Sequence, residues 1–227
     1  TDSVPYFWGT LGIVYNDKFV KPGAIKTWND LWSKKYRRQI LLVDSARDAM
    51  GMALVSLGYS MNTTSSIKLH LAQTKLNSLG PNIKAIISDE MKMYLVQNEA
   101  AIGVTWSGEA YEMMEQNPHL HYVVPKQGSN LWFDNFVIPK TVQNKKAALK
   151  FINFMLEPKN AAQNAEYVGY ATPNTAAQKL LPKKVRDDRQ FYPTQSTLKN
   201  LQVFRDLGPK KTQEYNDLFL EFKMYAR

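Results

Sequence analysis

Short runs of β-branched and aliphatic residues alternate with helical stretches along most of this chain, and that alternation restricts the fold more than any other feature. The apolar runs are residues 39–43, 83–87, 101–106 and 121–124. Between or after these runs, apolar residues recur with helical spacing at 65–79, 89–98 and 109–116. Strands that alternate with helices in this way are typical of α/β domains. The sequence therefore predicts an α/β fold.

The other segments fit the same architecture. Residues 4–15 are β-branched and aromatic and are expected to be extended, and Thr27 is a plausible N-cap for a short helix starting at Trp28. Further helices are expected at 144–156, 159–167, 175–180, 194–203 and 210–225.

The composition excludes several classes of site. The 227 residues contain no cysteine, which rules out disulfides, thiol catalysis and thiolate metal sites. The net charge of +9 raises nucleic acid or an anionic surface as a partner. The basic residues, however, lie in short scattered groups, and no RNA-binding, zinc-finger or basic-zipper signature accompanies them. Nucleic acid is therefore not expected, and no apolar run reaches the length of a membrane span.

Catalytic machinery is hard to assemble from this sequence. The three histidines are His70, His119 and His121, and none has a neighbouring Ser, Asp or Glu in a pattern typical of a nucleophile or a metal site. There is no glycine-rich phosphate loop and no dinucleotide-binding fingerprint. We therefore expect no enzymatic activity, no cofactor and no metal.

Trp132 and Asp134 form the most suggestive pair in the chain. They follow a Gly-Ser-Asn turn, and residues two apart in an extended segment point to the same face. An aromatic ring beside a carboxylate suits an organic cation, because the ring quadrupole and the negative charge both attract an ammonium group. The alternative is a buried tryptophan beside a surface aspartate, and the pair alone does not decide between these interpretations.

Other aromatic and acidic residues lie at the ends of predicted segments. Trp106 ends a predicted strand, and Asp44, Ser45 and Asp48 lie where another strand leads into a helix. Capping and the helix dipole are sufficient to explain these polar residues. A cleft is the second interpretation, since ligands collect at the carboxyl ends of strands in open α/β sheets.

Eight short motifs are spread along the chain: Val4-Pro5-Tyr6-x-Trp8-Gly9, Trp28-x-Asp30-Leu31-Trp32, Leu41-Leu42-x-Asp44-x-Ala46-Arg47, Leu57-Gly58-Tyr59-Ser60-x-Asn62-Thr63-Thr64, Trp106-x-Gly108, Trp132-x-Asp134, Ile152-Asn153-Phe154 and Gly169-Tyr170-x-Thr172-Pro173-Asn174. These motifs occur in the same order and spacing in the spermidine/putrescine-binding proteins of bacterial ABC transporters. The chain resembles that family over essentially its whole length.

The resemblance implies two α/β lobes joined by hinge strands, each lobe of the periplasmic-binding-protein type II kind, with a mixed sheet and helices on both faces. The polyamine would lie in the cleft between the lobes. Carried over by matching motif, Trp106, Trp132, Asp134 and Tyr170 are implied ligand-binding residues. Asp48 is another, at a position where the family usually has Glu.

Two positions depart from the family pattern. Ser45, which we keep among the implied ligand-binding residues, stands where close relatives carry an aspartate that binds the ligand. Phe204 stands where they have a glutamine that reaches the amine. These departures motivate an alternative, namely a binding protein of the same fold for a different small amine or an organic acid.

The family pattern also begins well before the position of Thr1, so the resemblance implies that most of the first lobe is missing. Residues 1–7 would be hinge, 8–127 and 169–227 the second, carboxyl-terminal lobe, and 128–168 a returning segment of the first lobe with hinge crossings. On that assignment residues 134–167 lack their usual neighbours. We expect them to expose apolar surface, to pack on another chain or to be rearranged.

The function implied by the resemblance is that of an extracytoplasmic solute-binding protein. Such a protein captures spermidine or putrescine and delivers it to the permease subunits of an ABC transporter. It would reside in the periplasm or, in a Gram-positive bacterium, on the outer face of the membrane. Its only membrane association would be through a lipid anchor outside this chain.

Overall fold

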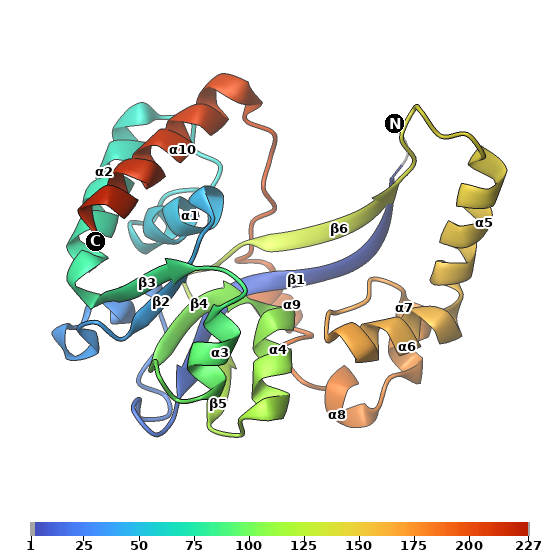
Figure 1. The fold of residues 1–227 in the computed structure, drawn as a ribbon, viewed down its shortest axis with the longest axis horizontal. Helices are drawn as coiled ribbons and strands as arrows, with labels where there is room; N and C mark the ends of the chain where they lie inside the picture. The colour runs from blue at the N-terminus through green and yellow to red at the C-terminus, as the bar shows by residue number, and fades with distance from the viewer. Residues whose placement is uncertain (1–2, 227) are drawn as a thin grey trace.

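A mixed six-stranded sheet organises residues 3–226, the part of the chain that the computed structural model describes (Figure 1). Its strands are β1 (Ser3–Asn16), β2 (Ile40–Val43), β3 (Ile83–Ile87), β4 (Ile102–Trp106), β5 (Leu120–Val123) and β6 (Leu131–Val137). The strand order is β3-β2-β4-β1-β5, and β6 also pairs with β1. Strand β2 is parallel to β3 and β4, whereas β1 is antiparallel to β4, β5 and β6. The expected α/β fold with a mixed sheet is confirmed.

Strand β1 has different neighbours along its length. Residues 11–15 pair with β4 and residues 13–16 pair with β5. Residues 3–10 pair instead with β6. The two strands β1 and β6 run together away from the main sheet toward α5 (Lys145–Leu156), as Figure 1 shows. A single strand therefore belongs to the core at one end and to a two-stranded extension at the other.

Helices cover both faces of the main sheet. In Figure 1, α1 (Ala46–Ser56), α2 (Ser66–Leu79) and α10 (Gly208–Tyr225) lie on one face, and α3 (Met91–Val96) and α4 (Ser107–Gln116) lie on the other. The remaining helices are α6 (Pro158–Val168), α7 (Thr175–Leu180), α8 (Lys183–Arg186) and α9 (Gln195–Leu198), with short 3-10 turns η1 (Trp28–Trp32), η2 (Lys34–Tyr36) and η3 (Gly80–Asn82). None of the helices within residues 3–226 has the length and apolarity needed to cross a membrane.

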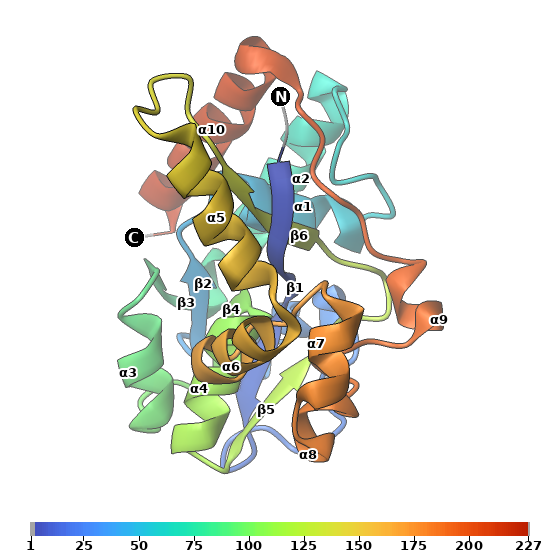
Figure 2. The ribbon, with the colours of Figure 1, turned by 90° about the vertical axis from the view of Figure 1, so that its right-hand side faces the viewer.

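The buried side chains form two clusters. The larger fills the space between the main sheet and its helices and includes Leu11, Trp28 and Tyr215. The smaller gathers Phe7 with residues of α6, α7 and the segment around Phe191. Figure 2 shows α5, α6 and α7 in front of the β1–β6 extension.

The domain limits proposed from the resemblance stay a prediction. The smaller cluster contains Ala165 and Ala171, which lie on either side of the predicted boundary at residues 168 and 169. The predicted hinge 1–7 includes Thr1 and Asp2, and the predicted second lobe ends with Arg227; these three residues lie outside the described part of the chain.

One predicted helix is wrong. The sequence predicts a helix over 194–203, but only Gln195–Leu198 is helical. Gln202 instead forms a parallel bridge with Asn130: its N–H donates to the Ser129 carbonyl at 2.8 Å and its carbonyl accepts from the Leu131 N–H at 2.9 Å. These bonds join segments about seventy residues apart, and local helical propensity contains no information about them.

The expectation that residues 134–167 expose apolar surface is confirmed. Val137, Phe151, Phe154 and Tyr167 are 62%, 56%, 54% and 90% exposed. Helix α5 buries only Ile152, so most of its apolar face is uncovered in the isolated chain.

Trp28 anchors the segment that leads from β5 toward β6. Its ring is fully buried, and its indole N–H donates to the Gly128 carbonyl at 2.9 Å. Its backbone N–H donates to Gln127 Oε1 at 2.7 Å. A single side chain thus joins η1 to a loop one hundred residues later.

We predict that Trp28→Ala lowers the free energy of unfolding by about 3–5 kcal/mol, because it leaves a large cavity and an unpaired carbonyl. Urea denaturation followed by circular dichroism measures the loss. Ile67→Ala is the control, since Ile67 is 77% exposed and its truncation should change stability by less than about 0.5 kcal/mol. Equal effects of the two substitutions would contradict the anchoring role.

Candidate ligand-binding site

Four of the six predicted site residues line one pocket. Trp106, Trp132, Asp134 and Tyr170 surround a volume of about 300 Å³. Trp106 ends β4, Trp132 and Asp134 are two apart on β6, and Tyr170 follows α6. The alternation of β6 brings Trp132 and Asp134 to the same face, as expected for a strand. Residues far apart in sequence therefore supply three aromatic rings and one carboxylate to the same hollow.

Two glycines let the aromatic rings lie against the backbone. Gly9 is the cross-strand partner of Trp132, and a Cβ at Gly9 would overlap the indole ring. A Cβ at Gly108 would overlap the ring of Tyr170. The positions of both rings thus depend on the absence of a side chain beneath them. The sequence alone assigns these glycines no role, because nothing local indicates which ring packs on them.

Tyr170 is fixed by contacts at both ends of its ring. It meets Trp132 edge to face with 5.2 Å between ring centroids, and its hydroxyl donates to Glu109 Oε1 at 3.1 Å. Glu109 in turn forms an ion pair with Lys92 at 2.6 Å. Burial and the neighbouring Glu109 raise the pKa of the Tyr170 hydroxyl, so it stays a neutral donor. Glu109 was missed in the sequence, since no motif links it to Tyr170.

Asp134 is exposed on the open side of the pocket. Partial burial raises the pKa of its carboxyl above the usual aspartate value. No ion pair of Asp134 exists among residues 3–226. The pocket thus contains an acidic group whose charge is not balanced by a nearby cation.

Asp48 and Ser45 are not among the residues that line the pocket. Ser45 is the N-cap of α1, and its hydroxyl accepts from the Asp48 N–H at 3.4 Å. Asp48 is only 4% exposed, and one carboxylate oxygen, Oδ1, has no hydrogen-bond partner. Burial raises the pKa of Asp48, while hydrogen bonds from Ser45 and Trp106 and the charge of Arg47 act in the opposite direction. Their direct contact with a ligand stays a prediction, and the geometry links Asp48 to the pocket through Trp106.

Phe204 packs against a cation. The Arg47 guanidinium lies 4.4 Å from the centroid of the Phe204 ring and 5.0 Å from that of Tyr215. Arg47 also donates to Asn62 Oδ1 at 3.0 Å. These contacts tie the segment around Phe204 to the start of α1.

The histidines form an arrangement that the sequence does not predict. His119 Nδ1 and His121 Nε2 each lie 2.8 Å from an oxygen of the Asp17 carboxylate. Hydrogen bonds from His121 and His119 lower the pKa of Asp17. Asp17 is about a hundred residues from its partners in sequence, so no local pattern reveals the contact. Within residues 3–226 no group of three or more His, Cys, Asp or Glu side chains has the geometry of a metal site.

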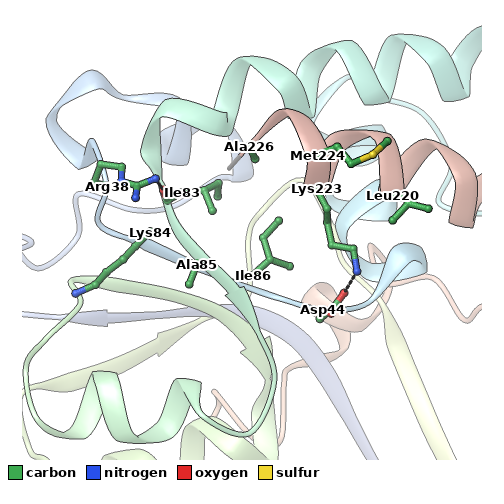
Figure 3. A pocket seen from close by; sticks show the side chains of 10 residues that line it. All are labelled: Arg38, Asp44, Ile83, Lys84, Ala85, Ile86, Leu220, Lys223, Met224 and Ala226. Atoms are coloured by element: carbon green, nitrogen blue, oxygen red, sulfur yellow. Dashed lines mark hydrogen bonds and ion pairs between the residues drawn. The ribbon is translucent and has the colours of Figure 1, made fainter.

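A second hollow lies between β3 and α10 and is shown in Figure 3. It has a volume of about 380 Å³ and is lined by aliphatic side chains and three cationic ones, including Lys223 in an ion pair with Asp44 at 2.9 Å. It has no aromatic ring and no unbalanced carboxylate. The four-residue pocket around Trp132 is therefore the better candidate for binding an organic cation.

Comparisons with known proteins identify the family of this chain. Residues 1–193 match the sequence profile of the family described as bacterial extracellular solute-binding protein. The spermidine/putrescine-binding periplasmic protein of Escherichia coli is 40% identical over 206 residues, which is 91% of this chain. The chain spans 59% of that relative's length.

Solved structures show the same fold at higher identity. The spermidine/putrescine ABC transporter substrate-binding protein PotD from Streptococcus pneumoniae is 56% identical with a TM-score of 0.91, and the match covers 99% of this chain and 69% of that one. A putative spermidine/putrescine ABC transporter protein from Listeria monocytogenes is 55% identical with a TM-score of 0.93, covering 98% and 69%.

We predict that the free energy of unfolding of Asp48→Asn increases relative to that of the wild type as the pH rises. Below the ordinary pKa of aspartate, Asp48 is protonated in both the folded and the unfolded state. Above it, the unfolded state releases the proton first, because burial raises the folded-state pKa. Stability is therefore lost with rising pH until the folded carboxyl also ionises.

Asparagine has no such loss, so urea denaturation at about pH 4 and pH 7 should show the difference between variant and wild type shifting toward the variant. The exposed Asp89 provides the control as Asp89→Asn. A shift toward the wild type with rising pH would mean that Asp48 is stabilised as a carboxylate.

Proposed function

This chain belongs to the bacterial extracellular solute-binding proteins, and from that premise we propose that it is the polyamine-binding component of an ABC transporter. The proposal covers spermidine and putrescine, the ligands printed in the names of its relatives in Escherichia coli and Haemophilus influenzae. The protein captures the polyamine outside the cytoplasm and delivers it to the permease subunits. Its role is binding and transport, without a catalytic step.

The pocket formed by Trp106, Trp132, Asp134 and Tyr170 is the observation that carries this proposal. A polyamine is a chain of methylene groups that joins ammonium groups. Aromatic rings suit both parts, since they offer apolar area to the methylenes and a negative quadrupole to the cations. The unbalanced carboxylate of Asp134 suits one ammonium group.

Asp48 and Ser45 support the pocket in this proposal. Trp106 lies close enough to the Asp48 carboxyl to act on its pKa, so Asp48 helps to orient one aromatic wall. Ser45 caps the helix that carries Asp48. Burial disfavours the ionised form of Asp48, and a bound ammonium nearby would favour that form because opposite charges attract strongly in a medium of low polarity.

The net charge of +9 does not oppose the binding of a polycation. Exposed charges are screened beyond about 8 Å at physiological ionic strength. The groups within that distance of a bound amine decide the interaction, and they include Asp134 and the Glu109 carboxylate that accepts from Tyr170.

We further propose that the pocket is one wall of a cleft. The relatives are longer than this chain, which spans 59% of the Escherichia coli protein. Paired strands β1 and β6 leave the main sheet beside Trp132, and they suit a hinge between two lobes. Closure around the amine would then present one defined conformation to the permease.

A different small amine or an organic acid on the same fold is the second candidate. Phe204 favours it, because its ring contacts the Arg47 guanidinium and offers no polar atom to an amine.

Calorimetric titration of the full-length protein with spermidine and with putrescine tests the proposal. We expect saturable binding of at least one. An absence of heat with both would refute polyamine binding and favour the second candidate. The 227-residue chain alone should bind weakly or not at all, because one wall of the cleft buries an amine only in part.

We predict that Trp132→Ala in the full-length protein weakens polyamine binding by about 0.5–2 kcal/mol, which is roughly 2- to 30-fold. The loss comes from the ring that faces the amine. Phe133→Ala is the matched control, since Phe133 is the next residue of β6 and points to the opposite face. Equal losses for both substitutions would place the amine elsewhere.

Binding should also weaken as the pH falls through the pKa of Asp134, which is raised in the free protein. The amine pairs with the carboxylate and not with the protonated acid, so affinity is present above that pKa and lost below it. Asp134→Asn should bind more weakly at neutral pH and lose this dependence. An unchanged pH profile in Asp134→Asn would exclude Asp134 as the partner of the ammonium.

A further inference from the structure

More than half of the chain's net positive charge comes from one short segment. Residues 17–39, between β1 and β2, hold seven lysines and arginines against two aspartates, a net +5 out of +9. This segment forms the blue loops at the lower left of Figure 1, on the opposite side of the molecule from α5. The charge excess is therefore local, and it lies away from the β1–β6 extension.

An exposed aromatic ring lies among these cations. Phe19 is 54% exposed and lines one hollow together with Lys18, Lys21 and Lys35. The neighbouring Lys34 and Arg37 are exposed as well. We call these six residues the basic loop patch. A phenylalanine between lysines at a loop tip combines apolar and cationic groups on one surface.

The loop that carries Phe19 is held rigidly. Val20 is buried at 2% exposure, and its N–H and that of Phe19 donate to the Asn16 carbonyl at 2.9 and 3.1 Å. The Asn16 side chain, which is fully buried, accepts from the Lys18 N–H at 3.0 Å and donates to Asn98 Oδ1 at 2.7 Å. Phe19 therefore faces outward because the backbone is fixed there, and burying it would require these bonds to break.

The two nearby carboxylates balance only part of the positive charge, although Asp30 lies close enough to Lys35 to interact with its charge. Asp17 is engaged by His119 and His121. Asp30 accepts from the backbone N–H groups of Lys26 and Thr27 at 2.8 Å. No cation of the patch belongs to an ion pair within the described residues. The positive charge thus remains available to an external partner.

We propose that the basic loop patch docks this protein on an anionic lipid bilayer. Each lysine or arginine near a negatively charged membrane surface contributes to attraction. An exposed aromatic ring partitions into the region between headgroups and acyl chains. A polyanion without apolar or aromatic groups would use the cations but not Phe19, whereas a bilayer offers an anionic surface to the lysines and an apolar layer to the exposed ring. The docking does not depend on the identity of the transported solute.

Co-sedimentation of the 227-residue chain with vesicles tests the proposal. We expect binding to vesicles of phosphatidylcholine mixed with phosphatidylglycerol, and little binding to phosphatidylcholine alone. Replacing Lys18, Lys21 and Lys35 together by glutamine should lower the partition coefficient at least about tenfold. Phe19→Ala should lower it several-fold while leaving the charge unchanged. Circular dichroism would verify that each variant is folded.

The matched control replaces Lys145, Lys146 and Lys150 of α5 by glutamine. These lysines are also exposed, and the charge change is the same. The control should lose much less binding than the loop variant. Equal losses in the two triple variants would overturn the proposal, because net charge alone would then explain the attraction. Unaltered binding of Phe19→Ala would overturn it too, since a bilayer should accept the ring.

Discussion

The antiparallel pairing of β1 along its whole length is the constraint on which the rest of the structure depends. One half of this strand is hydrogen-bonded within the main sheet to β4 and β5, and the other half pairs with β6. Register in a sheet fixes which face each side chain occupies. The pairing of Gly9 with Trp132 therefore determines where the Trp132 indole lies. The pairing of Leu11 with Trp106 likewise determines the position of the Trp106 backbone at the end of β4. A pocket built from three distant segments is positioned by a single continuous backbone.

Much of this arrangement is predictable from sequence. The alternating strands and helices indicate the α/β class, and alternation along β6 brings Trp132 and Asp134 to one face. The contacts that hold the site in place, by contrast, are not predictable from local sequence. The bond from Tyr170 to Glu109 and the histidine pair around Asp17 join residues that are 61 and about a hundred positions apart. Gln202 likewise leaves its predicted helix to pair with Asn130. Such contacts exist only once the fold brings the segments together, so a local pattern cannot contain them.

The positive and negative charges of the molecule lie in different regions. A basic segment lies between β1 and β2, while the pocket combines aromatic rings with Asp134 and is flanked by Glu109. Lys92 compensates Glu109 directly, at 2.6 Å. Asp134 has no such partner in the described chain, and Asp48 is buried with one oxygen unpaired. Asp134, which lines the pocket and has no ion-pair partner within the described residues, is therefore the carboxylate best prepared to receive a cation from outside.

The hollow in Figure 3 has a consequence for the solution behaviour of the protein. Strand β3 is the last strand of the sheet, and an uncovered edge strand is a template for pairing with another chain. Arg38 donates to the Ile83 carbonyl at 3.2 Å and so occupies one acceptor on that edge. Lys84 follows immediately, and Lys223 of α10 lines the same hollow. A second molecule that approached this edge would have to bury the charges of Arg38 and Lys84, which have no ion-pair partner among the described residues, against an identical set. Electrostatic repulsion and the occupied carbonyl thus protect the sheet from edge-to-edge aggregation.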